Sequence, residues 1–299
     1  MAAGRTRIAL AIATLTVIWG TTWAVIRIGL EGIPPFTGVA ARFAIAFLFL
    51  LALIRQRKIP LGKQPHEVKL WFLNGLLAFC LTYGAVYWAE QHITSGLAAV
   101  LFATFPLFVA ILAHFLLPGE PLSFWKLTGT VLGFAGVAVI FSEDLTLVGG
   151  EKAYLAAGLA LLAPPACAIT SVAIKRWGKA IHPLSISGIP MGITAGVMSA
   201  AALAFESDRT VVLNTKSISA LLYLAVMGTA VTFSLYYWLL RQVSATGLSL
   251  IAYMTPVVAV LVGTQFMDET MTPRTWAGSG LVVAGVALAS LAARARKPA

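Results

Sequence analysis

The sequence predicts an all-α polytopic membrane protein, and its composition carries that prediction. Hydrophobic residues make up 59% of the 299 residues, the mean hydropathy is +0.89, and only 11% of the residues are charged. A soluble domain carries about 25% charged residues, so this chain is too poor in charge to cover itself with a soluble surface. Most of its surface is therefore expected to face lipid.

Ten apolar segments are candidates for membrane-crossing helices. A helix needs about 20 apolar residues to cross the hydrocarbon core, and continuous apolar runs favour helices over the alternating strands of a barrel. Eight uncharged runs reach that length: Ile8–Ile26, Leu70–Ala89, Ile93–Leu117, Ala153–Ile174, Pro183–Phe205, Ser217–Leu240, Gln242–Met267 and Thr275–Ala293. Two further segments are shorter or interrupted: Leu127–Ser142, and Pro34–Ile54, which carries Arg42.

The placement of Lys and Arg predicts that both ends of the chain lie in the cytoplasm. With the N-terminus inside, the inner loops carry about three times as many of these residues as the outer ends of the spans. Cytoplasmic loops of membrane proteins show this excess. We therefore expect a multi-pass protein of the cell inner (cytoplasmic) membrane with an N-in/C-in topology.

The second half of the sequence repeats features of the first half. Residues of the first half fall in order on residues of the second: Arg27, Gly29, Pro34, Glu120 and Gly129 on Arg176, Gly178, Pro183, Glu269 and Gly278. We predict two five-helix repeats, residues 1–149 and 150–299. Because each repeat crosses the membrane an odd number of times, the second would be inverted. Secondary transporters have this arrangement and bind substrate where the repeats meet.

Several short motifs recur in the order typical of one transporter family. The first half has Trp19-Gly20, the segment Thr94–Ala99 followed by Pro106, and Glu120-Pro121-Leu122 before a glycine-rich stretch. The second half has Ser244–Gly247, Pro256 and Glu269, but Ala168-Ile169 at the position of Trp19-Gly20. In these motifs the chain resembles the EamA-type, ten-helix branch of the drug/metabolite transporter superfamily. Within the branch it is most similar to YddG-type exporters of aromatic and other neutral amino acids, and export is what this resemblance implies.

Polar and aromatic residues at helical spacing are the candidates for a central cavity. Aromatic rings can pack on an apolar substrate side chain, while hydroxyl groups and free carbonyls meet its polar groups. The candidate lining residues are Trp19, Thr22, Trp23, Arg42, Tyr83, Tyr87, Phe105, Ser171, Ser234, Tyr237, Trp238, Tyr253 and Thr255. The alternative for aromatic residues near span ends is the interfacial belt. Pro106 and Pro256 are expected to kink their helices and to act as hinges or gates.

Two charged residues leave alternatives open. Arg42 is the deepest charge in any span, where it either binds a substrate carboxylate or extends outward and braces the fold. Glu90, near the outer end of the third span, either carries a proton or is solvated. Because no Asp or Glu lies at mid-depth, we expect transport by facilitated diffusion. A flux that required an imposed pH gradient would contradict this expectation.

The charges also predict the class of substrate. Few Lys or Arg residues lie deep in a span, which disfavours phosphorylated sugars, and deep carboxylates that would suit a polycationic drug are lacking. We therefore expect a secondary transporter that exports neutral amino acids, aromatic ones included, or related small metabolites by alternating access. The alternative within the superfamily is an exporter of drugs or other metabolites.

Other protein classes fit the sequence poorly. A membrane enzyme would need converging acids, histidines or cysteines at depth, whereas His66, His92, His114 and His182 are scattered. We expect no enzyme activity, cofactor or metal site. Despite the net charge of +10, no continuous basic face or nucleic-acid motif is present. The expected partners are a small-molecule substrate and the lipid bilayer.

Glycines form small faces on the fifth and tenth spans. These faces contain Gly129, Gly133 and Gly136 in the fifth span and Gly278 and Gly285 in the tenth. Small residues let membrane helices approach closely, so we expect packing between helices of the same chain. A monomer is the expected state, with a homodimer through these helices as the alternative.

Overall fold

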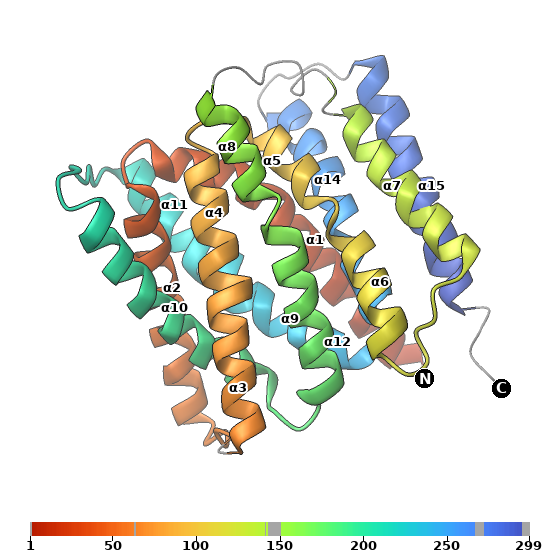
Figure 1. Ribbon diagram of the computed structural model, residues 1–299, viewed down its shortest axis with the longest axis horizontal. Helices are drawn as coiled ribbons and strands as arrows, with labels where there is room; N and C mark the ends of the chain where they lie inside the picture. Colours follow the sequence, from red (N-terminus) through yellow and green to blue (C-terminus); the bar gives the residue numbers. More distant parts are fainter. Residues whose placement is uncertain (1, 63, 141, 143–150, 267–271, 295–299) are drawn as a thin grey trace.

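A computed structural model describes residues 2–62, 64–140, 142, 151–266 and 272–294. Glu269, which the predicted repeat pairs with Glu120, lies outside these residues. Every regular element of the described chain is helical (Figure 1). The first half contains α1 (Ala2–Leu30), α2 (Pro35–Gln56), α3 (Pro65–Leu73), η1 (Asn74–Leu81), α4 (Thr82–Ala89), α5 (Ser95–Phe102), α6 (Phe105–Leu116) and α7 (Phe124–Ile140). The second half contains α8 (Glu151–Ala160), α9 (Ala163–Trp177), α10 (Pro183–Phe205), α11 (Thr215–Ala225), η3 (Val226–Val231), α12 (Thr232–Gln242), α13 (Ala245–Ser249), α14 (Ile251–Phe266) and α15 (Pro273–Arg294).

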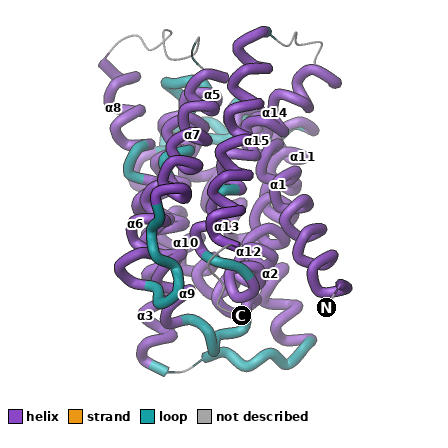
Figure 2. Tube along the Cα trace, turned by 90° about the vertical axis from the view of Figure 1, so that its right-hand side faces the viewer, coloured by secondary structure: helices purple, strands orange, loops and turns teal. Residues whose placement is uncertain are grey.

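Eight helical segments are long and apolar enough to cross a membrane. They are Gly4–Leu30, Pro35–Gln56, Pro65–Ala89, Leu97–Leu116, Lys152–Trp177, Pro183–Phe205, Thr215–Gln242 and Pro273–Leu291. Two shorter apolar helices, Phe124–Ile140 and Ala245–Val258, complete the order expected from the sequence. The all-α membrane fold is thus confirmed, while the count of ten spans remains a prediction. Helix α1 begins and α15 ends at the same end of the bundle, as an even number of crossings requires (Figure 2).

Helices of the two halves exchange contacts in a reciprocal way. Helix α1 packs on α14, and α9 packs on α6. Under the predicted repeat, the first span corresponds to the sixth and the fourth to the ninth, so these are the same contact with the halves exchanged. Helix α2 packs on α10, and α7 packs on α15, which are pairs of corresponding spans. A twofold relation between the halves would produce this pattern.

The third and eighth predicted spans each contain a π-helical segment, which the sequence did not predict. The segment η1 lies between α3 and α4, and η3 lies between α11 and α12. They occupy corresponding places in the two predicted repeats. A π turn leaves the regular hydrogen-bond pattern of the helix and often marks a functional site. Both segments supply polar atoms to the centre of the molecule, the Gly228 carbonyl from η3 and the Asn74 side chain from η1.

The glycine faces of α7 and α15 pack against each other within the chain. A Cβ atom on Gly129 would lie 2.6 Å from the Gly285 carbonyl oxygen, and one on Gly136 would lie 2.6 Å from the Val282 nitrogen. The helices run side by side at one edge of the bundle (Figure 1). The expected packing role is therefore observed. These faces are occupied within the chain and are not free for a second copy.

Replacing Gly278 by leucine is expected to destabilise this helix pair. A Cβ atom on Gly278 would lie 2.6 Å from the Gly136 carbonyl oxygen and 2.9 Å from the Ile140 nitrogen, and backbone atoms cannot yield locally. Overpacking costs about 1–3 kcal/mol and lowers the melting temperature by roughly 2–4 °C per kcal/mol. Thermal unfolding in detergent measures the effect. The control is Gly280→Leu on the same helix, where a Cβ atom meets nothing within 4 Å. Equal melting temperatures of the two variants would contradict the prediction.

Candidate functional site

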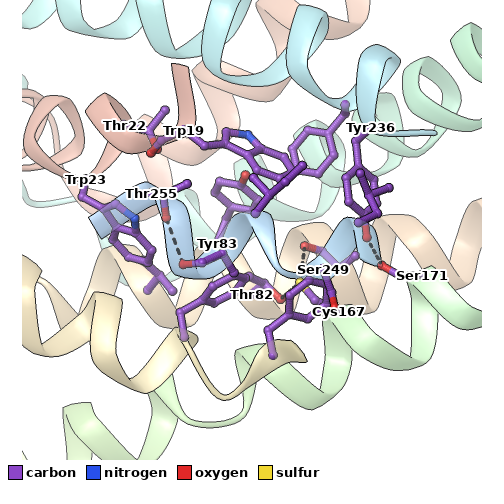
Figure 3. Close-up of a pocket in the computed structure, with 18 of the residues that line it drawn as sticks. Trp19, Thr22, Trp23, Thr82, Tyr83, Cys167, Ser171, Tyr236, Ser249 and Thr255 are labelled. Carbon is purple, nitrogen blue, oxygen red and sulfur yellow. Dashed lines mark hydrogen bonds between the residues drawn. The ribbon is translucent and has the colours of Figure 1, made fainter. Parts of the chain in front are cut away.

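A cavity lies at the centre of the bundle, where helices of both halves meet. It contains about 910 Å³ of empty space, part of it open to solvent. Its walls come mainly from α1, α4, α9, α12 and α14, with further residues from α2, η1, α5, α6 and α13 (Figure 3). Described residues that line it include one cation, Arg42, and no carboxylate. The cavity is therefore mainly apolar, with a single positive charge in its wall.

Aromatic rings form much of the wall. The ring centroid of Trp19 lies 5.6 Å from that of Phe233 and 5.5 Å from that of Tyr236. A second group of rings lies between α1 and the α5–α6 break, where Phe102 stacks on Phe105 at 5.7 Å. Edge-to-face and offset aromatic contacts of this kind suit an apolar or aromatic ligand side chain.

The guanidinium group of Arg42 is held by three neutral acceptors. Its Nε atom donates to the Thr229 hydroxyl at 2.6 Å, and the two terminal nitrogens donate to the Tyr87 hydroxyl and the Gly228 carbonyl, both at 3.0 Å. Gly228 and Thr229 belong to η3, so the π segment supplies two of the acceptors. The Tyr83 ring lies 4.7 Å from the guanidinium carbon.

These contacts bear on both alternatives for Arg42. Its side chain is only 1% exposed, so it does not extend outward to the membrane surface. It links α2 to η3 and α4, and it also lines the cavity. The three bonds use three of the five N–H donors of a guanidinium group. A charge held only by neutral groups favours an anionic partner in the cavity.

Hydroxyl groups connect the helices of the cavity wall, within the second half and between the two halves. The Tyr236 hydroxyl donates to the Ser171 hydroxyl at 2.9 Å, and the Tyr237 hydroxyl donates to the Asn74 side-chain oxygen at 2.7 Å. Asn74 begins η1 and also donates to the Ile186 carbonyl of α10. Both π segments thus anchor side chains at the cavity, in opposite halves of the chain.

Nine of the thirteen candidate lining residues border the cavity. They are Trp19, Thr22, Trp23, Arg42, Tyr83, Phe105, Ser171, Tyr237 and Thr255. Tyr87 lies behind the wall, hydrogen-bonded to Arg42, and Ser234 of α12 donates to the Ala230 carbonyl of the preceding segment η3. Trp238 packs against the main core. Tyr253 is fully buried elsewhere, with its ring against Gly133 of α7.

The two candidate hinge prolines lie near helix breaks. Pro106 stands at the second position of α6, directly after the break at Ala103 and Thr104 that separates α5 from α6. Pro256 lies inside α14, six residues after the break at Leu250 that separates α13 from α14. Each predicted kink therefore has a break on its N-terminal side.

Sequence reasoning missed several lining residues. Those with aromatic or polar side chains are Thr82, Phe102, Cys167, Phe233, Tyr236 and Ser249. Phe233 and Tyr236 are direct neighbours of the candidates Ser234 and Tyr237. The signal was therefore present in the aromatic-rich segment of α12, where the candidates included Tyr237 but left out these two lining residues.

Polar contacts tie helices together at the end of the bundle expected to face the cytoplasm. The Glu120 carboxylate accepts hydrogen bonds from the backbone nitrogens of Ala245 and Thr246 at 2.8 and 3.1 Å, and from the Thr246 hydroxyl at 3.3 Å. Lys175 donates to the Val243 carbonyl at 2.7 Å, and Arg176 donates to a carbonyl at the end of α6. These bonds link α6, α9, α12 and α13 below the cavity.

Comparison with known proteins supports the resemblance seen in the sequence. The profile of the EamA-like transporter family matches residues 6–142 and, a second time, residues 154–291. The match thus covers the two halves of the chain separately. A solved crystal structure with 21% sequence identity superimposes with a TM-score of 0.80, covering 96% of this chain and 99% of its own. At that identity the likeness shows the fold alone.

Curated relatives match over nearly the full length. The uncharacterized inner membrane transporter YedA of Escherichia coli K12 is 32% identical over 293 residues, which cover 94% of this chain and 90% of the relative. The uncharacterized transporter YoaV of Bacillus subtilis is 26% identical, with 94% and 95% covered. The protein PagO of Salmonella typhimurium is 26% identical, with 82% and 80% covered. From the family profile, the full-length relatives and its apolar helices, the chain belongs to the EamA-like transporter family and is a multi-pass transporter of the cell inner membrane.

Proposed function

We propose that this transporter exports neutral amino acids, aromatic ones included, by alternating access through the central cavity. The observation that carries the proposal is Arg42, a buried cation with only neutral hydrogen-bond partners, in a cavity walled by aromatic rings. A substrate carboxylate would bind to the two N–H donors that remain. An apolar or aromatic side chain would lie against Trp19 and Phe233. Hydroxyl groups such as those of Ser249 and Thr255 would accept from the ammonium group.

The charge of the cavity argues for this substrate class over the alternative within the superfamily. A cationic drug would be repelled by Arg42, and no described lining residue offers a carboxylate to it. A phosphorylated sugar would want several cations rather than one. A zwitterion needs one cation and a few neutral acceptors, which is the set that the lining provides.

Alternating access is supported by the relation between the halves. The reciprocal contacts, the paired π segments and the double family match fit two repeats that exchange conformations around one site. We propose that the repeats, residues 1–149 and 150–299, are inverted. With the bonds of Glu120, Lys175 and Arg176 in place, the structure would represent the state closed to the cytoplasm. Export is the direction that the family resemblance implies, with the substrate moving down its own gradient.

Transport in proteoliposomes tests the proposal. The purified chain is reconstituted into proteoliposomes, which are loaded with unlabelled leucine, phenylalanine or methionine. Counterflow is followed as the entry of the same labelled amino acid, without ion gradients. Lysine, glutamate and phenylalaninamide, which lacks the carboxylate, serve as comparison substrates. We expect counterflow of the three neutral amino acids and little of the others. If none of the neutral amino acids exchanges, the proposed substrate class is wrong.

Replacing Trp19 by alanine is expected to weaken binding of phenylalanine more than binding of alanine. The Trp19 ring packs on Phe233 and Tyr236, so it is placed to meet a ligand ring. Aromatic pairs contribute about 0.5–1.5 kcal/mol, which corresponds to roughly 2- to 12-fold in half-saturating concentration. Concentration-dependent counterflow measures the effect. Trp125→Ala, at an exposed tryptophan of α7, is the control and should change neither substrate. An equal loss for both substrates in the Trp19 variant would argue against ring contact.

A further inference from the structure

Glu90 is a buried acid that the proposed transport mechanism does not use. It follows directly on the last residue of the span Pro65–Ala89 and is the C-terminal cap of α4. Its side chain is only 4% exposed, so it is not solvated at the outer end of the span as one sequence-based alternative held. Among the residues that the structure describes, none donates a hydrogen bond to either carboxylate oxygen. The C-terminal end of a helix also disfavours a negative charge.

A carboxylate in this position is stable only if it is neutralised. Burying an ionised carboxylate without hydrogen bonds or an ion partner is costly, and proton binding removes that cost. Burial accordingly raises the pKa of Glu90 to about 8, against the opposing effects of Arg27 and Arg42. The acid therefore holds its proton to a higher pH than a solvated glutamate does.

The charged and titratable groups around Glu90 come from three helices. Arg27 at the outer end of α1 and Arg42 of α2 act on it electrostatically, as does Tyr87 one turn earlier on α4. Helices α8 and α9 also pack against α4. Lys152 and Tyr154 of α8 are exposed to the outside of the bundle, and Cys167 of α9 lines the cavity. Beyond Glu90, Gln91 accepts a hydrogen bond from Arg209, and the His92 ring lies against Trp88.

Arg42 connects Glu90 to the cavity. The guanidinium group lines the cavity and donates to the Tyr87 hydroxyl at 3.0 Å, while Tyr87 and Glu90 are three residues apart on one face of α4. The positive charge of Arg42 favours the ionised form of Glu90. A ligand carboxylate bound to Arg42 would offset the effect of the Arg42 charge on Glu90. The neutral form of Glu90 would then be favoured.

We propose that Glu90 is a proton-binding site at the outer end of the bundle, and that ligand occupancy of the cavity controls its protonation through Arg42. The second half of this proposal rests on the proposed function. Glu90 takes one proton from the outer solution when a carboxylate binds to Arg42, and it returns the proton to the same solution when the ligand leaves. No proton crosses the membrane. External acid therefore strengthens binding in the outward-facing state and slows release, without driving transport.

The proton site is tested without any ligand, by infrared difference spectroscopy of the full chain in detergent across a pH series. We expect a protonated carboxyl band that titrates around pH 8 in the wild type and is absent in Glu90→Gln. Glu31→Gln, at an exposed acid, should leave the band unchanged. Arg42→Gln should move the titration to higher pH, whereas Arg42→Lys, which keeps the charge, should leave it near the wild-type position. If the protonated carboxyl band persists in Glu90→Gln, Glu90 is not the proton-binding site. If the band of a folded Arg42→Gln protein titrates at the wild-type pH, Arg42 does not control the protonation of Glu90.

Phenylalanine serves as the probe for the link to cavity occupancy. Adding it to the wild type in weak buffer near pH 8 should produce net proton uptake, and adding it to Glu90→Gln should produce none. Binding without proton uptake in the wild type overturns the link. If phenylalanine does not bind at all, the proposed function and the ligand link both fail, while the ligand-free titration still decides the proton site. Accumulation of phenylalanine driven by an imposed pH gradient would show that the proton crosses the membrane, which contradicts the proposal.

Discussion

Replacing Arg42 by glutamine is expected to reduce the affinity for neutral amino acids more than any other single change in the cavity. The variant removes the only cation among the described lining residues. A buried, hydrogen-bonded charge contact contributes about 2–5 kcal/mol, so the affinity should fall between roughly 30-fold and several thousand-fold. The loss should be specific for the carboxylate. Wild-type protein should prefer phenylalanine over phenylalaninamide, and the variant should treat the two alike.

The comparison of phenylalanine with phenylalaninamide separates an effect of the Arg42→Gln change on carboxylate binding from an effect on protein stability. Arg42 also holds Tyr87, Gly228 and Thr229, so its removal leaves buried polar groups without a partner and destabilises the protein. Destabilisation alone would weaken both ligands equally. Arg42→Lys should retain part of the preference for the acid, because it keeps the charge with fewer donors. Arg55→Gln, at an exposed arginine of the same helix, is the charge-matched control. If Arg42→Gln keeps the wild-type preference, the carboxylate binds elsewhere.

The sequence was sufficient to predict the apolar segments and to single out Arg42 as a charge deep in a span. Hydropathy over a window of about 20 residues reflects contact with lipid, which depends on local composition and not on tertiary packing. A charge inside such a window is costly wherever the helix packs, so Arg42 stands out without a structure. The burial of Glu90 could not be predicted in the same way, since its place at a span end fits solvent equally well.

The face that α12 presents to the cavity could be predicted only in part. A residue advances an α-helix by about 100°, and a π turn takes in an extra residue, so the helix after it is rotated relative to an uninterrupted one. In α12, directly after η3, the candidate Tyr237 lines the cavity together with Phe233 and Tyr236, whereas the candidate Ser234 does not. Because η3 could not be predicted from the sequence, helical spacing alone could not decide which residues of α12 face the cavity.

Tyr253 shows a second limit of sequence reasoning. Its place in α14, beside lining residues of the same helix, made it a reasonable candidate for the cavity. In the structure its ring fills the space beside Gly133, where a Cβ atom would lie 2.7 Å from the ring. Which helix covers a glycine face depends on tertiary packing. Neither residue alone contains that information.

Replacing Glu120 by alanine is expected to open the end of the bundle that is predicted to face the cytoplasm. The Glu120 carboxylate holds the start of α13 through the backbone nitrogens of Ala245 and Thr246. In a state open to the cytoplasm, water could satisfy these donors. Hydrogen bonds to a charged group contribute about 1.5–3 kcal/mol, so the inward-open population should rise roughly 10- to 150-fold.

Cys167, which lines the cavity, is a natural reporter of this opening. In a Cys80→Ala background it is the only cysteine, and an impermeant maleimide added to the cytoplasmic face of inside-out vesicles should label it faster when Glu120 is replaced. Glu206 provides the matched control. Its carboxylate accepts the same three kinds of bond, from the Phe36 and Thr37 nitrogens and the Thr37 hydroxyl at the start of α2, but at the opposite end of the bundle. Glu206→Ala should not increase labelling from the cytoplasmic face. Equal labelling in both variants would mean that loss of a helix cap loosens the whole protein, and that Glu120 does not hold one gate closed.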